Sequence, residues 1–400
     1  MKNFALRWFW TTGLPLATGL IGVSCQTEDA QPETMAGQVA PVVRVWDEPR
    51  VQPDRIILTW EDDPATTQSV TWRTGPSVTT PVAEVTLATP HPGMVNAALQ
   101  VEARSTTVDA SIVEDEHVVA AFHTATFRNL IPDTLYAYRV GDGETWSEWF
   151  QFRTASAEPE PFSFVYFGDA QNDIMPLWSR VVRASALEAP DMAFMIHAGD
   201  LVNRAHRNTE WGEWFEAGSF LHAMFPSIAA LGNHEIRPYN QEEDSLGIRH
   251  LSIYWQPQFA FPNHGPEGVD AETVYYVDYQ GVRIVVLNSS GDREAQAKWL
   301  DRILEQNPHD WVVVTHHHPI FSASEERDNE ELRTAWKPIY DRHGVDLVLQ
   351  GHDHTYARGR TQTYAAAASE NVPTGVNLRD GETGTVYVVS VSGRKMYDLK

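Results

Sequence analysis

The feature that most constrains this sequence is a series of apolar runs, each followed at once by a short polar motif. Runs of this length, alternating with segments of helical periodicity, predict the buried strands of an α/β domain. Ligand sites in such domains form at the carboxyl ends of the strands, so we expect the motifs to meet in one crevice. In chain order, the motifs are Gly168-Asp169-Ala170-Gln171, Gly199-Asp200-Leu201-Val202-Asn203, Gly232-Asn233-His234-Glu235, Thr315-His316-His317-His318-Pro319 and Gly351-His352-Asp353-His354.

These motifs supply Asp, Asn and His side chains but no cysteine. Oxygen and imidazole donors of this kind suit borderline or hard cations such as Zn, Fe(II), Mn or Mg. Any one motif is weak evidence, because a lone Gly-Asp is usually a turn and a lone His-x-His usually lies at the surface. Their recurrence after successive apolar runs predicts a metal site.

Helical periodicity fills the spaces between several of the runs. We expect helices over 176–189, 294–306 and 330–341, and further strands at 282–287 and 385–391. The connection 236–275 is long and rich in aromatic residues, which predicts a functional or locally structured segment.

Residues 42–156 have a different pattern, with short β-type segments separated by turn residues. Regular short strands of this kind predict a β-sandwich. No cluster of titratable groups in this region suggests catalysis, so we interpret it as a spacer or as a module that shapes a neighbouring site. A Pro- and Glu-rich stretch at 155–161 places the boundary near 157, so that the second domain covers 157–400.

The N-terminus has the features of an export signal. Lys2 and Arg7 precede an interrupted apolar run, and the segment 1–25 ends in Ile21-Gly22-Val23-Ser24-Cys25. This ending resembles a bacterial lipobox, which implies a lipid-anchored protein at the periplasmic or cell surface. The alternative is ordinary cleavage and secretion. Residues 26–41 suit a flexible tether. We expect no other membrane attachment, and the end of the chain soon after its last strand suggests a shortened C-terminus.

Charge and cysteine content exclude some classes of protein. Lys plus Arg number 30 against 54 Asp plus Glu, a formal net charge of −24. This balance argues against a nucleic-acid-binding face. It is compatible with a phosphorylated substrate, since bound cations invert the local charge. A single cysteine excludes an internal disulfide framework and a four-cysteine zinc site.

The order and wording of the motifs resemble the calcineurin-like metallophosphoesterases, and within them the purple acid phosphatase-like enzymes. The segment 130–140 also resembles the late strands of the fibronectin type III-like domain that precedes the catalytic domain in those enzymes. The resemblance covers roughly residues 42–397. It implies an all-β sandwich followed by a catalytic domain layered α/β/β/α. It also implies hydrolysis of phosphomonoesters by a metal-bound hydroxide.

The resemblance also assigns roles to individual residues. It implies a pair of metal ions, divalent or trivalent (Fe, Zn, Mn or Mg), both bound by the bridging carboxylate of Asp200. His234 would not bind metal but would contact the phosphate and help to protonate the leaving group. The remaining implied ligands are Asp169 and His354 for the first metal, and Asn233, His317 and His352 for the second.

Two positions depart from the family pattern. Asn203 stands where the purple enzymes have a tyrosine, so the characteristic colour should be absent. Gln171 stands where many relatives have a histidine. Both residues are either metal ligands or supports for the ligands. Arg204 and His318 are candidates for substrate binding, with plain surface exposure as the alternative for each. The same two interpretations apply to Arg207, Arg358 and His316. His197 is interpreted as a buried imidazole or as a group that orients Asp200.

Two other functions remain open at this point. A phosphodiesterase or nucleotidase would use the same pair of metals. A surface binding protein with an inactive second domain is an alternative of another class, although the complete set of core ligands argues against it.

Overall fold

The structure is a computed structural model that describes residues 44–362 and 383–398. The expected signal, tether and lipidated Cys25 lie outside the described residues. Among the helices described, none has the length and hydropathy needed to cross a bilayer.

The first part of the described chain is an all-β sandwich of two antiparallel sheets. One sheet has the order β1-β2-β6-β5 and the other the order β4-β3-β7-β8. Alternate residues such as Leu58, Val70, Trp72, Tyr138 and Val140 pack between the sheets. The strands are β1 (Asp54–Thr59), β2 (Gln68–Thr74), β3 (Val82–Leu87), β4 (Leu99–Glu102), β5 (Arg104–Asp109), β6 (Val119–Phe127), β7 (Leu135–Gly141) and β8 (Phe150–Arg153), with short helices η1 (Pro92–Ala97) and η2 (Ala110–Ile112).

The second part is built on two further sheets. A parallel sheet has the order β11-β10-β9, and a six-stranded mixed sheet has the order β14-β15-β16-β17-β19-β18. Only the two outer pairs of the mixed sheet, β14 with β15 and β18 with β19, are antiparallel. The strands are β9 (Ser163–Phe167), β10 (Met192–His197), β11 (Ser227–Ala229), β14 (Tyr275–Tyr279), β15 (Val282–Val286), β16 (Trp311–Thr315), β17 (Leu347–Gln350), β18 (Ala357–Gln362) and β19 (Thr383–Val389).

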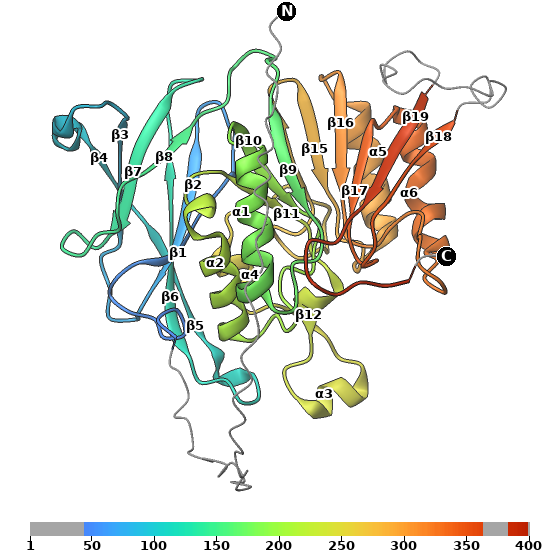
Figure 1. Ribbon diagram of the computed structural model, residues 1–400, viewed down its shortest axis with the longest axis horizontal. Helices are drawn as coiled ribbons and strands as arrows, with labels where there is room; N and C mark the ends of the chain where they lie inside the picture. The colour runs from blue at the N-terminus through green and yellow to red at the C-terminus, as the bar shows by residue number, and fades with distance from the viewer. Residues whose placement is uncertain (1–43, 363–382, 399–400) are drawn as a thin grey trace, which may run out of the picture. The chain divides into compact units, whose positions relative to one another are not determined.

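Helices cover the outer faces of these sheets (Figure 1). On the mixed sheet, alternate residues divide between two cores: Val285 and Val314 pack against α5 and α6, whereas Ile284 and Val286 face the parallel sheet. The layers are therefore α/β/β/α, and helices occur near the three predicted positions. The helices at these positions are α1 (Ser179–Glu188), which follows η3 (Ile174–Trp178), α5 (Arg293–Glu305) and α6 (Glu330–His343). A further helix, α2 (Asn208–His222), lies outside the predicted ranges.

The long connection after β11 is locally structured, which was one of the two expectations. A short helix, η4 (Asn233–Glu235), leads into β12 (Ile236–Arg237), which pairs with β13 (His250–Leu251). Two further short helices, α3 (Gln241–Leu246) and α4 (Trp255–Gln258), complete the segment.

The sandwich packs directly on the α/β part. Ile57, Trp60 and Phe122 of the sandwich belong to the same apolar core as Phe194 and Trp211. Polar groups cross the boundary as well. The side-chain oxygen of Asn208 at the start of α2 accepts hydrogen bonds from Arg55 (2.7 Å) and Arg73 (2.9 Å). The described residues from Arg44 onward belong to one compact unit.

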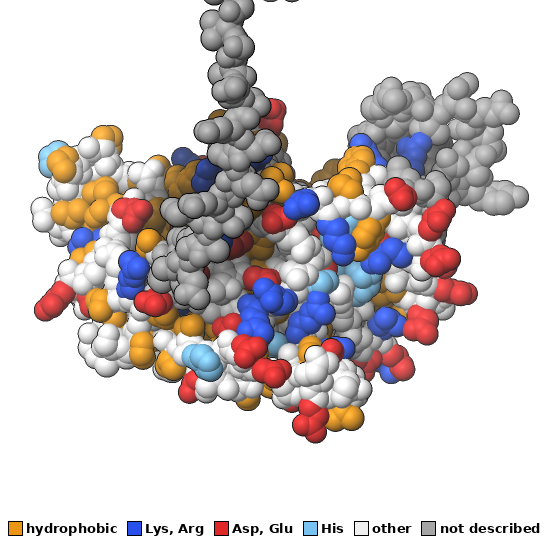
Figure 2. Space-filling model, turned by 60° about the horizontal axis from the view of Figure 1, so that its bottom comes forward, with side chains coloured by type: hydrophobic (Ala, Val, Ile, Leu, Met, Phe, Trp, Pro, Cys, Tyr) orange, Lys and Arg blue, Asp and Glu red, His pale blue; other side chains and the backbone are white. Residues whose placement is uncertain are grey.

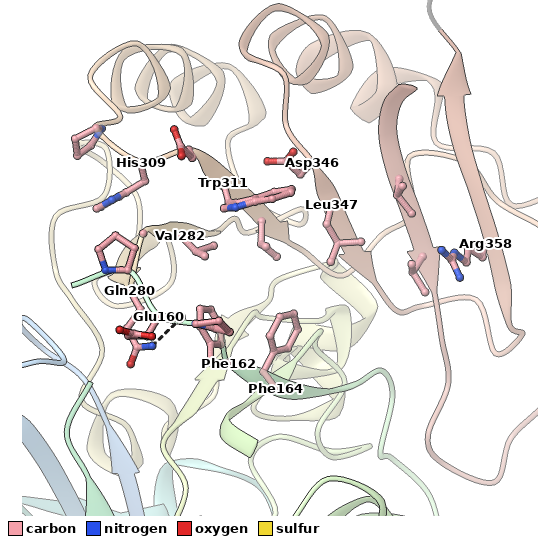
Figure 3. A pocket seen from close by; sticks show the side chains of 18 of the residues that line it. Glu160, Phe162, Phe164, Gln280, Val282, His309, Trp311, Asp346, Leu347 and Arg358 are labelled. Carbon is pink, nitrogen blue, oxygen red and sulfur yellow. Dashed lines mark hydrogen bonds between the residues drawn. The ribbon is translucent and has the colours of Figure 1, made fainter. Parts of the chain in front are cut away.

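An apolar cavity of about 930 Å³ opens between the two sheets at the amino ends of their strands (Figure 3). Phe162, Phe164, Val282 and Leu347 line it, together with Arg358. None of the predicted metal ligands reaches it. The chemistry of the polar motifs therefore belongs to the opposite, carboxyl end of the strands.

Candidate metal centre

The polar motifs meet at the carboxyl ends of the strands because glycines let the loops approach closely. Gly199, after β10, has a φ of 85°, and a Cβ there would lie 2.6 Å from the backbone nitrogen of Gly232. A Cβ on Gly232 would lie 2.1 Å from Oδ1 of Asp200. Asp200 and His352 themselves have positive φ values of 53° and 68°. Such backbone strain is typical of functional sites.

One group of possible metal ligands lies on the side of Asp200 that faces His317. Nε2 of His317 lies 3.2 Å from Oδ2 of Asp200 and 3.1 Å from Oδ1 of Asn233. Nδ1 of His352 lies 3.1 Å from the same imidazole nitrogen. Asp200, His317 and His352 each offer one atom within 4.8 Å of the others, a spacing that suits a shared cation.

A second group of donors lies on the other side of Asp200. Nε2 of His354 is 3.2 Å from Oδ2 of Asp169. The amide nitrogen of Gln171 lies 2.9 Å from Oδ2 of Asp200 and 3.3 Å from Nε2 of His354. The structure thus brings Asp169, Gln171 and His354 together.

Backbone carbonyls fix the orientation of the imidazoles. Nδ1 of His317 donates to the carbonyl of Ala198 (2.9 Å), and Nδ1 of His354 donates to the carbonyl of Lys395 (2.9 Å). In both rings Nε2 is left facing the site. Metal-binding histidines are usually held in this way, because the hydrogen bond selects the tautomer.

The buried carboxylates of Asp169 and Asp200 give the centre a negative charge that a nearby cation would stabilise. Burial raises the pKa of Asp169 to about 7. Burial alone would lower the pKa of His317, but the carboxylates of Asp200 and Asp169 outweigh it and raise that pKa to about 9. Burial likewise opposes ionisation of Asp200, yet His317 and backbone donors bring its pKa below the usual range. A proton on His317 therefore balances carboxylates that a metal cation would balance equally well.

The donor set fits a pair of metal ions. Asp169, Asp200, His317 and His354 are almost fully buried, and buried charged groups are normally paired or bound to metal. Oε1 of Gln171 is buried without a hydrogen-bond partner. Rotation of the amide group by 180° would turn this oxygen towards Asp200 and His354.

His234 lies beside the donors without joining them. Its Nδ1 donates to the carbonyl of Asn203 (2.7 Å), and its Nε2 is 3.8 Å from Oδ2 of Asp200. Burial lowers the pKa of His234, and the neighbouring Arg237 lowers it further, against the opposite effect of Asp200. Nε2 is the ring nitrogen that faces Asp200, with Nη2 of Arg237 3.3 Å away, a position that suits a group that exchanges a proton with a substrate.

Glu235 is a site residue to which the sequence analysis gave no role. It is fully buried, and Oε2 accepts hydrogen bonds from the backbone nitrogens of Asp200 (2.8 Å) and Gly232 (2.8 Å), while Oε1 accepts from Leu201 (2.9 Å). Burial and the nearby Asp200 raise the pKa of Glu235 to about 8. Its place in the Gly-Asn-His-Glu motif was a signal, but its partners lie on another loop.

The remaining predicted residues divide between the site and the fold. His318 is half-buried, with its ring 4.1 Å from that of His352. Arg204 is exposed at the rim and paired with Glu210. The backbone carbonyl of Asn203 accepts the hydrogen bond from His234 described above. Asn203 also lines a polar cavity of about 470 Å³.

Four residues lie away from the chemistry. His316 is fully buried against Trp336, so neither substrate contact nor solvent exposure describes it. His197 is a buried imidazole stacked on Phe167, and its Nε2 has no hydrogen-bond partner. Arg207 pairs with Glu116 of the sandwich, and Arg358 lines the apolar cavity.

Comparison with known proteins agrees with this arrangement. Residues 53–154 match the family described as the N-terminal domain of purple acid phosphatase, and residues 163–356 match the calcineurin-like phosphoesterase family. The chain belongs to the purple acid phosphatase-like metallophosphoesterases. This family comprises metal-dependent phosphoester hydrolases.

Relatives of this metallophosphoesterase include an uncharacterized protein of Mycobacterium tuberculosis strain H37Rv, 28% identical over 82% of the chain and 67% of the relative. Purple acid phosphatase 1 of Ipomoea batatas is 27% identical over 66% of the chain and 59% of its own length. A solved purple acid phosphatase from yellow lupin superimposes with a TM-score of 0.70 at 18% identity, over 87% of the chain and 66% of the lupin chain, and shows the shared fold.

Proposed function

We propose that this metallophosphoesterase is a phosphohydrolase that uses two metal ions and acts on phosphomonoesters. The observation that carries the proposal is the position of the Asp200 carboxylate. Its Oδ2 lies 3.2 Å from Nε2 of His317 on one side and 2.9 Å from the amide of Gln171 on the other. A carboxylate between two sets of donors is the arrangement that two cations require.

The residues divide into two metal sites that share Asp200. Asp169, Gln171 and His354 would hold one ion, and Asn233, His317 and His352 the other. When bound, the two cations would polarise the phosphate oxygens and lower the pKa of a water molecule. Zn, Mn, Fe and Mg are all compatible with these oxygen and imidazole donors.

The protein's own groups bind, orient and transfer protons. His234 would place Nε2 next to the ester, because its Nδ1 is committed to the carbonyl of Asn203. From there the protonated, imidazolium form of His234 would donate its Nε2 proton to the departing oxygen and become neutral. The half-buried His318 beside His352 would line the space in which the ester lies. Glu235 holds the backbone of the Asp200 loop and so keeps the bridging carboxylate in place.

Metal analysis combined with a panel of phosphoesters tests this function. Wild-type protein should bind two metal ions and release phosphate from monoesters, whereas Asp200→Ala should lose both metals and all turnover. Asp62→Ala, at an exposed carboxylate in the sandwich, is the matched control and should retain both properties. Preferential cleavage of a diester would instead indicate a phosphodiesterase. A protein that holds metal but cleaves no phosphoester would be a binding protein.

We also propose that the protein is exported and anchored to a membrane through Cys25. The cationic start, the short apolar run and the terminal position of the only cysteine support this proposal. Cell fractionation of wild type and Cys25→Ala provides the test. The wild-type chain should partition with detergent-soluble membrane protein, and the variant should not. Equal partition of the two would indicate that Cys25 carries no lipid.

A further inference from the structure

Arg237 is a cation beside the catalytic histidine to which no role has been assigned so far. It lies on β12, where it pairs with His250 of β13, three residues after His234. Its backbone carbonyl accepts a hydrogen bond from Nε2 of His206 (3.0 Å). The main chain that carries this side chain is therefore fixed by two neighbours.

The guanidinium of Arg237 has unused hydrogen-bonding capacity. Nη2 contacts Nδ1 of His234 and also lies 3.2 Å from the carbonyl oxygen of Asn203 and 3.3 Å from Nε2 of His234. Nε is buried and has no hydrogen-bond partner. An arginine offers five N–H donors in a planar fork, so this one can still bind an oxyanion.

Arg237 also lacks an acidic partner among the residues that the structure describes. Three other arginines near the centre are paired: Arg204 with Glu210, Arg327 with Asp353 and Arg394 with Asp173. Figure 2 shows Lys and Arg side chains gathered around histidines on one face of the molecule. A half-buried guanidinium that no carboxylate neutralises attracts an anion from solution.

The order of the groups indicates which part of a substrate would meet this cation. Nε2 of His234 is 3.8 Å from Oδ2 of Asp200, and Nη2 of Arg237 lies against the same ring, in contact with Nδ1 and 3.3 Å from Nε2. A phosphate held by the metals would be next to Asp200, and its leaving group would pass the proton donor His234. Arg237 then lies on the leaving-group side.

We propose that Arg237 binds an anionic group carried by the leaving group, such as a second phosphate or a carboxylate. This proposal rests on the proposed phosphohydrolase function and refines its substrate class. The site would favour diphosphates and phosphorylated acids over esters with neutral leaving groups.

Calorimetric binding of two non-hydrolysable probes to the metal-loaded full chain tests the proposal directly. Methylenediphosphonate carries a second anionic group, and methylphosphonate does not. Arg237→Gln should weaken methylenediphosphonate binding by roughly 10- to 100-fold, the usual contribution of a charge-assisted hydrogen-bonded pair, and methylphosphonate binding by less than about 3-fold. Arg237→Lys should recover part of the loss. Arg249→Gln, at an exposed arginine paired with Asp244 next to β13, is the control and should change neither.

Hydrolysis of diphosphate and of a neutral aryl monoester provides the second measurement. In Arg237→Gln, kcat/KM should fall for diphosphate while the aryl ester is spared. Equal losses for both probes or both substrates would overturn the proposal, since Arg237 would then act on the metal-held phosphate or through His234. Unchanged binding would overturn it as well. If the wild type cleaves no ester, the proposed function fails, and the two phosphonates still test Arg237.

Discussion

At the scale of single residues, Glu235 supports the candidate metal centre by holding the backbone of the loops that carry its ligands. Its two carboxylate oxygens accept backbone N–H groups from Asp200, Leu201 and Gly232. A glutamine has only one acceptor oxygen, so Glu235→Gln leaves buried N–H groups without a partner, at about 1–3 kcal/mol for each.

We therefore expect Glu235→Gln to lower metal affinity by roughly 10- to 100-fold, the usual effect of losing a group that supports metal ligands. Metal titration followed by calorimetry measures the change. Glu243→Gln, at the partly exposed carboxylate that pairs with His250, is the control. Wild-type affinity in Glu235→Gln would mean that the loop holds Asp200 without this carboxylate.

A site residue could be predicted from the sequence where a pattern in its immediate neighbourhood marks its position. Asp169, Asp200 and His317 were identified because each directly follows an apolar run. Glu235 was not assigned a role, because its partners are backbone groups of another loop. Arg237 carried no signal at all, since an arginine on a surface segment looks like ordinary charge until its neighbours are known.

At the scale of elements, the loops after β10 and β11 pack so closely that no side chain fits between them. A methyl group on Gly232 would lie 2.1 Å from Oδ1 of Asp200. We expect Gly232→Ala to displace Asp200, abolish metal binding and destabilise the fold by about 1–3 kcal/mol, as overpacking does. Gly359→Ala in β18, where no atom lies within 4 Å of the added carbon, should be tolerated. Metal content and thermal unfolding of the two variants check this contrast. Normal metal content in Gly232→Ala would refute it.

The packing of α2 against β10 predicts loss of stability in acid. His222, at the end of α2, stacks on Trp214 with the rings 4.1 Å apart, and burial lowers its pKa to about 3. His197 of β10 is shifted in the same direction. The unfolded chain binds these protons below a pH of about 6.5, whereas the folded chain does so only near the lowered pKa. The contribution of these neutral histidines to the free energy of unfolding is therefore complete above a pH of about 6.5. It is lost progressively as the pH falls from there towards the lowered pKa.

For His222 the loss amounts to about 2 kcal/mol at a pH of about 5. Neither ring nitrogen of His222 has a hydrogen-bond partner, so His222→Phe should flatten the dependence of the melting temperature on pH. His117→Gln, at an exposed histidine, should leave that dependence unchanged. An equally steep acid loss in His222→Phe would place its origin elsewhere.

Elements were predicted well where periodicity sets them. The strands that precede the motifs and the helices α1, α5 and α6 follow patterns with the period of their own structure. The short pieces between β11 and β14 could not be predicted in detail, because β12 and β13 are too short to have a pattern and depend on each other for pairing.

At the scale of the whole molecule, the sandwich and the α/β part share one core. Asn208 accepts hydrogen bonds from both Arg55 and Arg73, and burial lowers the pKa of Arg55 to about 9. Asn208→Ala leaves these buried cations short of a partner, so it should destabilise the protein by about 2–4 kcal/mol.

Calorimetry should show a single transition in wild type and a lower melting temperature in Asn208→Ala, with metal content unchanged in the folded protein. Asn96→Ala, at an exposed position in the sandwich, is the control. Separate transitions for the two parts would contradict a shared core. The sequence predicted both parts but not their contact, because buried arginines such as Arg55 and Arg73 resemble surface charges in a sequence.

The segment after β19 links the end of the described chain to the metal centre. Backbone nitrogens of Ser392 and Gly393 donate to the carbonyls of Gly168 and Asp169, and the nitrogen of Tyr397 donates to the carbonyl of His354. A purification tag or fluorescent fusion joined just after this segment would therefore disturb the backbone of Asp169 and His354, two of the proposed metal ligands. For recombinant work, we expect a C-terminal fusion to lower the metal content of the protein. Such a tag would therefore alter the property that it is meant to leave unchanged.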